Sequence, residues 1–361
     1  MLKQQKIFFD FLRFCIGSAK EIPDSLKEAD WKELYRIAQK QCLVGVLFDG
    51  IKKLPTEHVG MKKELLLQWM AESQMLEKAN VRLNDAVIQV SEWFRKKGFR
   101  TCILKGQGNA LMYPNPYSRT PGDIDIWVEG GDKRVISFVR SISPHEKACY
   151  HHIEFPSYKG VEVEVHYRPS FLLCFWHNRK LQKYYERVKE EQFSHRVMLG
   201  EQGEIAIPTV EFNLIFQLTH IYAHLMNEGI GLRQLLDYYY VLISDDLLLI
   251  RDRVQKELKE LGLWKFAGGI MYIMQEVFGM PASRLIVPPN EKYGKFVLNE
   301  VLEAGNFGKH DERNRFGKSK LGHNLQRVYR DMRLVRYFPA EALSEPFFRV
   351  WHFFWRLKHR R

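Results

Sequence analysis

Gly122-Asp123-Ile124-Asp125-Ile126 places two carboxylates two positions apart in an otherwise apolar run. If this run is a β-strand, its side chains alternate between two faces, so Asp123 and Asp125 share one face while the isoleucines point to the core. Two carboxylates side by side repel each other. A divalent cation such as Mg²⁺ removes that conflict because it prefers carboxylate, phosphate and water oxygens. A solvated strand face is the common alternative when such a pair stands alone.

A second run, Val161–His166, alternates without a break between valine and a polar residue. Glu162, Glu164 and His166 therefore share one face of a predicted strand. If this strand lies beside the strand predicted over Asp123–Glu129, three or four acids converge on a patch that suits a two-metal site for Mg²⁺ or Mn²⁺. The pattern leaves open whether Glu162 or Glu164 is the third carboxylate, and an exposed edge strand would show the same alternation.

A glycine-bearing turn, Lys105–Gly108, precedes the paired aspartates and follows a short apolar segment, Phe99–Leu104, that is predicted to be a strand. Backbone N–H groups in such a turn can contact a phosphate, helped by the N-terminus of the following helix. Arg119 adds a charge directed at phosphate, although most glycine turns only reverse the chain. The nucleotide-binding residues predicted from this region are Lys105, Gly106, Gln107 and Arg119.

Helical patterns flank this core on both sides. One runs from about residue 57 to Gly98, which is a good stop signal, and helical periodicity returns at Thr209 and continues almost to residue 361. We therefore predict an α+β fold with a mixed sheet. The predicted segments are a helical N-terminal segment (1–98), an α/β core (99–208) and a basic helical C-terminal domain (209–361).

The predicted helix Thr209–Met226 is apolar except for one polar stripe. The stripe residues are spaced by 4, 3 and 4 positions and are Asn213, Gln217, His220 and His224. Polar groups on an apolar helix need polar neighbours, so these residues either line the cleft or are satisfied polar groups of the core. Metal binding by the two histidines is the least favoured interpretation. Arg233, four residues before Asp237, predicts an internal salt bridge or a substrate contact.

The net charge of +12 is concentrated at the C-terminal end, where residues 306–361 hold 14 Lys or Arg against 5 Asp or Glu. Four arginines recur every three residues at Arg327, Arg330, Arg333 and Arg336, and Phe347–Arg361 mixes aromatic with basic residues. A nucleic acid could use these groups for phosphate contacts and stacking, and a membrane surface could accept the same helix. Packing of the aromatic residues into the helical domain is the favoured alternative.

The five cysteines are scattered and include no CxxC pair, which argues against a disulfide framework and a structural zinc site. The N-terminal residues lack a signal-peptide cleavage pattern, and no apolar window is long enough to span a membrane. We therefore expect a reduced, cytoplasmic protein.

The order of these motifs resembles the nucleotidyltransferase superfamily that includes DNA polymerase beta. More closely, it is similar to the bacterial group named only "nucleotidyltransferase family protein". The residues that carry this second resemblance are Ile103-Leu104-Lys105-Gly106, Tyr113, Arg119, Gly122-Asp123-Ile124-Asp125, Glu164-Val165-His166-Tyr167, Gly231-Leu232-Arg233 and Leu236-Asp237.

The resemblance implies that Asp123 and Asp125 bind the metals and that Glu164 is the third carboxylate, which helps to activate the acceptor hydroxyl. It also implies that Gly106 opens a turn over the triphosphate. The chain departs from the superfamily in two places: Gln107 stands where Ser is common, and the third acid is Glu where Asp is frequent. Glu162, His166, His220, His224 and Arg233 are possible cleft-lining residues.

The implied activity is Mg²⁺-dependent transfer of a nucleoside monophosphate from a triphosphate such as ATP to a hydroxyl group, with release of pyrophosphate. The acceptor could be a small molecule, a protein or an RNA. Two alternatives remain open. One is an RNA-binding or regulatory protein that has kept the fold, and the other is a metal-dependent nuclease or phosphodiesterase.

Overall fold

The computed structural model describes residues 3–55, 60–201, 203–308, 311, 313 and 320–359. It is a mostly helical α+β structure with a small mixed sheet, as the sequence predicts. The strands are β1 (Thr101–Ile103), β2 (Ile124–Val128), β3 (His152–Tyr158), β4 (Val161–His166), β5 (Arg196–Leu199) and β6 (Gly203–Ala206). The helices are α1 (Lys3–Ile16), α2 (Trp31–Lys40), α3 (Val44–Ile51), α4 (Lys63–Lys96), α5 (Gln107–Ala110), α6 (Gly131–Ile142), α7 (Phe175–Ser194), α8 (Val210–Asn227), α9 (Leu232–Leu242), α10 (Leu247–Glu260), α11 (Trp264–Phe278), α12 (Glu291–Ala304), α13 (Lys320–Leu334) and α14 (Pro339–Lys358).

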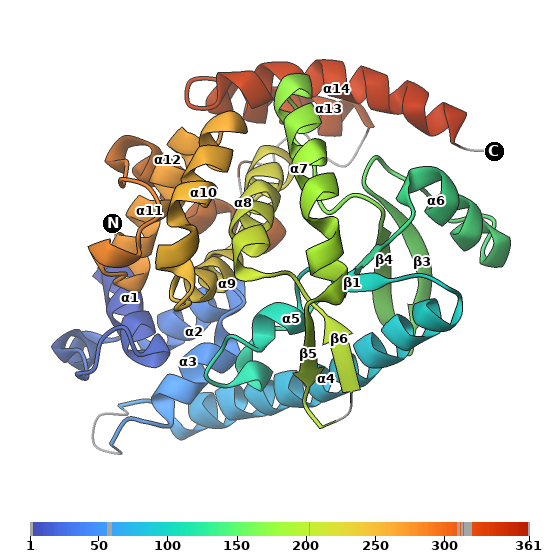
Figure 1. Ribbon diagram of the computed structural model, residues 1–361. Helices are drawn as coiled ribbons and strands as arrows, with labels where there is room; N and C mark the ends of the chain where they lie inside the picture. The colour runs from blue at the N-terminus through green and yellow to red at the C-terminus, as the bar shows by residue number, and fades with distance from the viewer. Residues whose placement is uncertain are drawn as a thin grey trace.

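The main sheet has the strand order β1-β2-β4-β3, with β2 and β4 parallel and both outer pairs antiparallel (Figure 1). The predicted neighbourhood of the two acidic strands is therefore confirmed. In the register of the parallel pair, Asp125 lies opposite Glu164 and Ile126 lies opposite Val165. Because side chains alternate, this register puts both carboxylates on one face and both apolar side chains on the other.

The apolar face of the sheet packs against α4 and α6. Ile124, Ile126 and Val165 from the strands join Val90 of α4 and Val135 of α6 in one buried cluster. The opposite face meets α7 and α8, since the ring of Trp127 lies 4.6 Å from Phe193 and 5.8 Å from Phe212. The acids therefore face the C-terminal helices, which form the other wall of the site.

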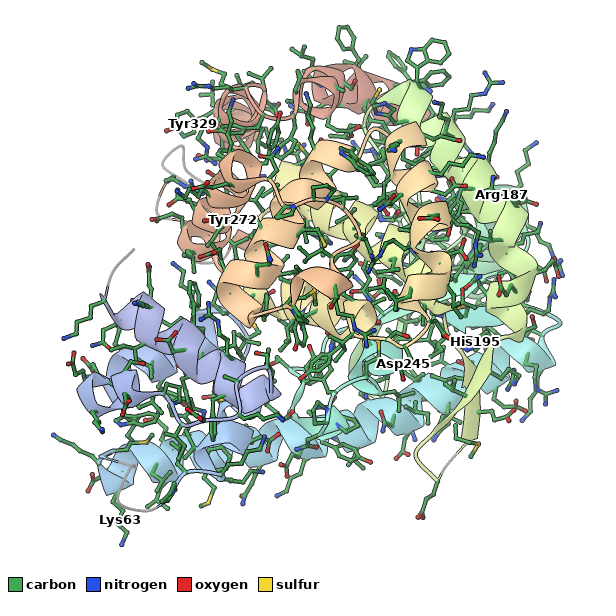
Figure 2. All side chains as sticks on the ribbon, turned by 60° about the vertical axis from the view of Figure 1, so that its left-hand side comes forward. Lys63, Arg187, His195, Asp245, Tyr272 and Tyr329 are labelled. Atoms are coloured by element: carbon green, nitrogen blue, oxygen red, sulfur yellow. The ribbon has the colours of Figure 1, made fainter. Side chains whose placement is uncertain are left out.

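Helix α4 is a single 34-residue strut that starts at Lys63 at one corner of the molecule and runs beneath the sheet (Figures 1 and 2). The predicted stop at Gly98 is confirmed, because its φ of 79° is left-handed backbone that favours glycine. The N–H groups of Gly98 and Phe99 donate to the carbonyls of Arg95 and Phe94 at 3.0 and 3.1 Å, which completes the helix end. Residues 57–59 of the predicted helix lie outside the described residues.

The N-terminal helices pack with the C-terminal ones around a shared core. Phe8 and Leu12 of α1 belong to the same buried cluster as Ile270 and Met274 of α11. Buried Gln41, at the end of α2, accepts a hydrogen bond from the backbone of Leu232 at 2.8 Å and donates to a carbonyl in α12 at 3.3 Å. The division into three segments therefore stays a prediction. Residues of the first segment (1–98) and the third segment (209–361) share one buried core.

The basic C-terminal region is only partly a free surface. Arg330 is buried and Arg333 pairs with Glu300 at 3.1 Å, so the four regularly spaced arginines do not form one solvated stripe. The favoured prediction that the last aromatic residues pack inward is wrong for several of them, since Phe347 and Phe354 of α14 are 79% and 63% exposed. Residues 360 and 361 of the predicted basic stretch lie outside the described residues. Within the described part of the chain, no helix is long and apolar enough to cross a membrane.

Candidate active site

Three carboxylates converge at the edge of the sheet. One oxygen from each of Asp123, Asp125 and Glu164 lies within 4.8 Å of the others, a spacing that one metal ion can bridge. Glu162 is exposed and is not part of this group, so the choice between the two glutamates that the sequence left open falls on Glu164. The two glutamates share one face of β4, and they differ in distance and burial: Glu164 is half-buried and lies opposite Asp125, whereas Glu162 is exposed.

Asp125 is 1% exposed, and two cationic side chains approach one of its oxygens. Lys105 Nζ lies 3.1 Å and His166 Nε2 lies 3.0 Å from Oδ1. The second oxygen, Oδ2, is buried and accepts a hydrogen bond from none of the described residues. A buried carboxylate oxygen without a donor is costly, so this position is prepared for a cation or a donor that comes with a ligand.

Asp125 and Glu164 stay ionised near neutral pH. Burial would raise the pKa of Asp125, but the charges of Lys105 and His166 outweigh burial and lower it. Burial would likewise raise the pKa of Glu164, but His166 and His152 lower it to about 2. His166 shows the reverse balance: burial would lower its pKa, and hydrogen bonds to Asp125 and Glu164 raise it to about 9. Three carboxylates with no sulfur ligand among them suit a hard divalent cation such as Mg²⁺.

The glycine turn brings Lys105 to this cluster. Gly106 has φ 66° and ψ −111°, a conformation that is essentially restricted to glycine, and it begins the short helix α5. A Cβ there would lie 3.6 Å from the carbonyl of Asp123, so strain rather than a clash selects glycine. The side chain of Gln107 is buried and donates to Asn84 of α4, so the backbone N–H is the group of this residue that could reach a phosphate.

Arg119 forms the wall of the cleft as half of a buried ion pair. Its Nε and Nη2 each donate to one oxygen of Asp237 at 2.8 Å, and both side chains are almost inaccessible. Asp237 is therefore in a salt bridge with Arg119. Its charge also acts on Arg233, whose pKa is lowered by burial and by Arg119 while Asp237 opposes that shift. The guanidinium of Arg233 donates to the carbonyl of Thr120 at 3.1 Å and lines the cleft near Gly122. Phosphate contact by Arg119 would require the pair to open.

The polar stripe of α8 lies partly in the cleft, as the spacing suggests. Gln217 and His220 line the cleft, and Gln217 donates to Asn109 of α5 at 3.1 Å. Burial and the charge of Lys105 push the pKa of His220 well below its usual value, so its neutral Nε2 accepts a hydrogen bond from Lys105 Nζ at 3.2 Å. His224 instead contacts Glu228 at 3.5 Å, and among the described residues the two histidines are in no potential metal-binding group.

Two functional neighbours were not identified from the sequence. His152 lies opposite His166 in the β3–β4 register, and its Nδ1 is 3.4 Å from Glu164 Oε2. Burial and His166 lower the pKa of His152 to about 4. Asn109 connects α5, α8 and Asp237 through hydrogen bonds. The sequence does contain an indication of His152, because it is a polar residue at the start of the strand that precedes the acidic strand β4. No sequence pattern indicates Asn109.

The cleft between the acids and α8–α9 holds only about 30 Å³ of free space, room for roughly two water molecules. The residues that line it are Lys105, Gly106, Asn109, Arg119, Gly122, Asp123, Asp125, Phe216, Gln217, His220, Ile221, Arg233, Gln234 and Asp237. A nucleoside triphosphate would need side chains such as Lys105 to move.

Residues 27–279 match the protein family described as "Uncharacterised nucleotidyltransferase". Among curated proteins, none matches the chain significantly. A solved structure of an antigenic nucleotidyltransferase-like protein from Paracoccidioides brasiliensis is 16% identical, with a TM-score of 0.28, and the match covers 50% of this chain and 92% of that one. At that TM-score we draw nothing from the structural likeness.

Proposed function

We propose that this chain, which belongs to the family of uncharacterised nucleotidyltransferases, transfers a nucleoside monophosphate from a triphosphate to a hydroxyl-bearing acceptor and releases pyrophosphate. The observation that supports this most is the buried oxygen Oδ2 of Asp125, which has no donor among the described residues and lies in a cluster with Asp123 and Glu164. Together these carboxylates would hold Mg²⁺, which screens the phosphate charge and favours ionisation of the acceptor hydroxyl.

The chain's own residues would then position the reactants. Glu164 Oε2 faces His152 and His166, so Oε1 would accept the hydrogen bond of the acceptor hydroxyl and take its proton as the new bond to phosphorus forms. Lys105 would leave Asp125 when a cation arrives and would turn to a phosphate oxygen, since both sites lie at the Gly106 turn. The ion pair of Arg119 with Asp237 would keep the wall rigid behind them.

Calorimetric titration of ATP, GTP, CTP and UTP in the presence of Mg²⁺ tests this proposal. Binding of a triphosphate that requires Mg²⁺ is expected, with a loss of at least tenfold in affinity for Asp125→Asn. Glu162→Gln is the matched control, because Glu162 is an acid on the neighbouring strand β4 but is exposed and outside the cluster. If a triphosphate bound Asp125→Asn as tightly as the unaltered protein, or if none bound the folded protein at all, the proposal would be wrong.

A further inference from the structure

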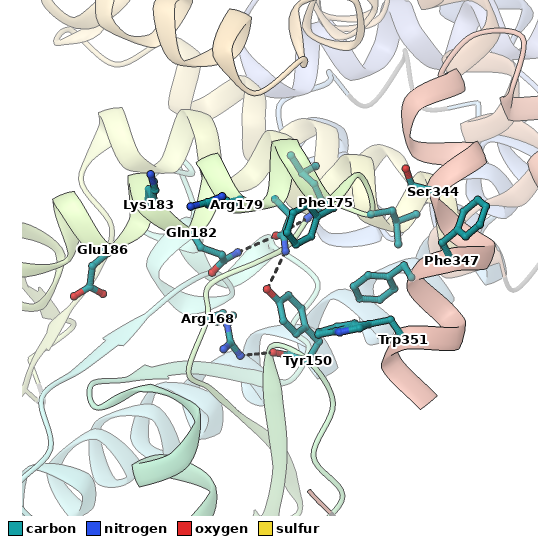
Figure 3. A pocket seen from close by; sticks show the side chains of 14 residues that line it. Tyr150, Arg168, Phe175, Arg179, Gln182, Lys183, Glu186, Ser344, Phe347 and Trp351 are labelled. Carbon is teal, nitrogen blue, oxygen red and sulfur yellow. Dashed lines mark hydrogen bonds between the residues drawn. The ribbon is translucent and has the colours of Figure 1, made fainter. Parts of the chain in front are cut away.

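A groove of about 700 Å³ lies between α7, α14 and the segment after β4, away from the acidic cleft (Figure 3). Its volume is within the range of small-molecule sites. None of its lining residues lines the cleft. Phe171 packs behind the groove, since its ring lies 5.1 Å from that of Phe348 and 4.9 Å from that of His151. The groove is therefore a second cavity with its own lining.

The walls of the groove are apolar and largely aromatic. Tyr150 forms the floor, where its ring lies 5.3 Å from Trp351 and its hydroxyl accepts a hydrogen bond from Asn178 at 2.8 Å (Figure 3). Phe175 of α7 and Phe347 of α14 stand at the mouth and are 65% and 79% exposed. Large aromatic side chains left in water beside a preformed cavity are typical of a surface that an apolar ligand covers.

The charges at the groove are unbalanced in favour of cations. Arg168 is neutralised by Asp132 at 2.8 Å, and Glu186 is neutralised by Lys189. Arg179 and Lys183, four residues apart on one face of α7, also line the groove. Within the described part of the chain, neither of these two makes a hydrogen bond or an ion pair. An acidic group of a ligand at the rim of the groove would give Arg179 and Lys183 an ion-pair partner.

We propose that this groove binds an amphiphilic acid, whose apolar chain or ring lies against Tyr150, Phe348 and Trp351 while its carboxylate or phosphate pairs with Arg179 and Lys183. An apolar body gains by leaving water at the aromatic wall. The two cations then select an anionic head group over a neutral or cationic one. The site is independent of triphosphate transfer, since the acidic cleft uses other residues.

Calorimetric titration of the full chain with dodecanoate, below the concentration at which it forms micelles, tests the proposal. Dodecyltrimethylammonium has the same chain with the opposite charge and is expected to bind at least tenfold more weakly. Arg179→Gln/Lys183→Gln should lower the affinity for dodecanoate about tenfold, the effect of two partly exposed ion pairs. Trp351→Ala should lower the affinity for both probes.

The matched control is Lys180→Gln/Arg187→Gln, which removes the same charge from the same helix at positions that do not line the groove. Equal affinities of this control and the Arg179/Lys183 variant, or equal binding of the two probes, would overturn the proposal. So would binding to vesicles that contain phosphatidylglycerol without binding of monomeric dodecanoate, which would assign the surface to a membrane. The affinity of the Arg179/Lys183 variant for the triphosphate should stay unchanged. A negative result for the groove would therefore not bear on the proposed nucleotidyl transfer.

Discussion

The ion pair between Arg119 and Asp237 should be one of the strongest single determinants of stability in this protein. Both side chains are buried, two hydrogen bonds of 2.8 Å join them, and Tyr113 donates a third bond to the same carboxylate at 2.7 Å. Asp237→Asn keeps the shape but leaves the guanidinium without a counter-charge. Removing one partner of a buried pair costs about 3–5 kcal/mol. Arg119→Met should cost a similar amount, because it leaves the carboxylate alone.

Urea unfolding followed by circular dichroism measures these losses, and the double variant makes the test sharp. When both charges are absent, neither member of the pair is left as a buried charge without its partner. The double variant should therefore lose at least about 2 kcal/mol less than the sum of the single losses. Additive losses, or single losses below about 1 kcal/mol, would refute the reasoning, because they would mean that water reaches the pair.

The same pair predicts a pH dependence. Burial would raise the pKa of Asp237, but Arg119 outweighs burial and lowers it below the usual value. A carboxyl group with a lowered folded pKa contributes stability that is present above its unfolded pKa, about 3.9, and that is lost as the pH falls through the folded pKa. The stability difference between the unaltered protein and Asp237→Asn should therefore be constant above about pH 5 and should shrink below about pH 4.

Three further predictions concern the acidic cluster and the end of α4. Lys105→Met should tighten Mn²⁺ binding, measured by electron paramagnetic resonance, because the ammonium group that competes for Asp125 is removed. The same variant should weaken binding of the Mg²⁺-triphosphate about tenfold. If both affinities changed in the same direction, Lys105 would not both compete with the cation and contact the phosphate. Glu164→Gln should weaken Mn²⁺ binding at least tenfold while Glu162→Gln changes it less than twofold, because only Glu164 lies in the cluster with the two aspartates. Equal effects of the two variants would contradict this assignment. Gly98→Ala should cost about 1–2 kcal/mol in urea unfolding, since its φ is 79° but a Cβ would meet nothing within 4 Å; no loss would show that the helix end can relax.

Much of the core was predictable because local patterns carry it. The alternation of Val161–His166 and the paired Asp123 and Asp125 predicted strands with one acidic face, and the structure has them. Gly98 predicted the end of a long helix because few other residues tolerate its backbone. The histidine and glutamine of the α8 stripe that line the cleft, Gln217 and His220, were also predicted from spacing alone.

Other features depended on partners distant in the chain. Arg119 was predicted to contact phosphate, but it pairs with an aspartate 118 residues away that is fixed by the packing of α9. Gln107 lies in the turn that is predicted to contact phosphate, and its side chain donates to Asn84 of α4. His152 differs from these two, because it reaches the cluster through a local hairpin: β3 pairs with β4 across Lys159-Gly160, where both residues have positive φ.

The sequence alone determined which residues could meet on one face of a strand or helix, because that depends on backbone periodicity over a few residues. The tertiary structure decided which faces meet. The parallel register set Asp125 opposite Glu164, and burial left Asp125 Oδ2 without a donor among the residues that the structure describes. The C-terminal helices supplied Asp237 to Arg119, and the meeting of α7 with α14 created an aromatic groove that no local pattern encodes. Contacts between distant segments form only when the whole core is buried. Their energies therefore cannot be predicted from the residues that are adjacent in the sequence.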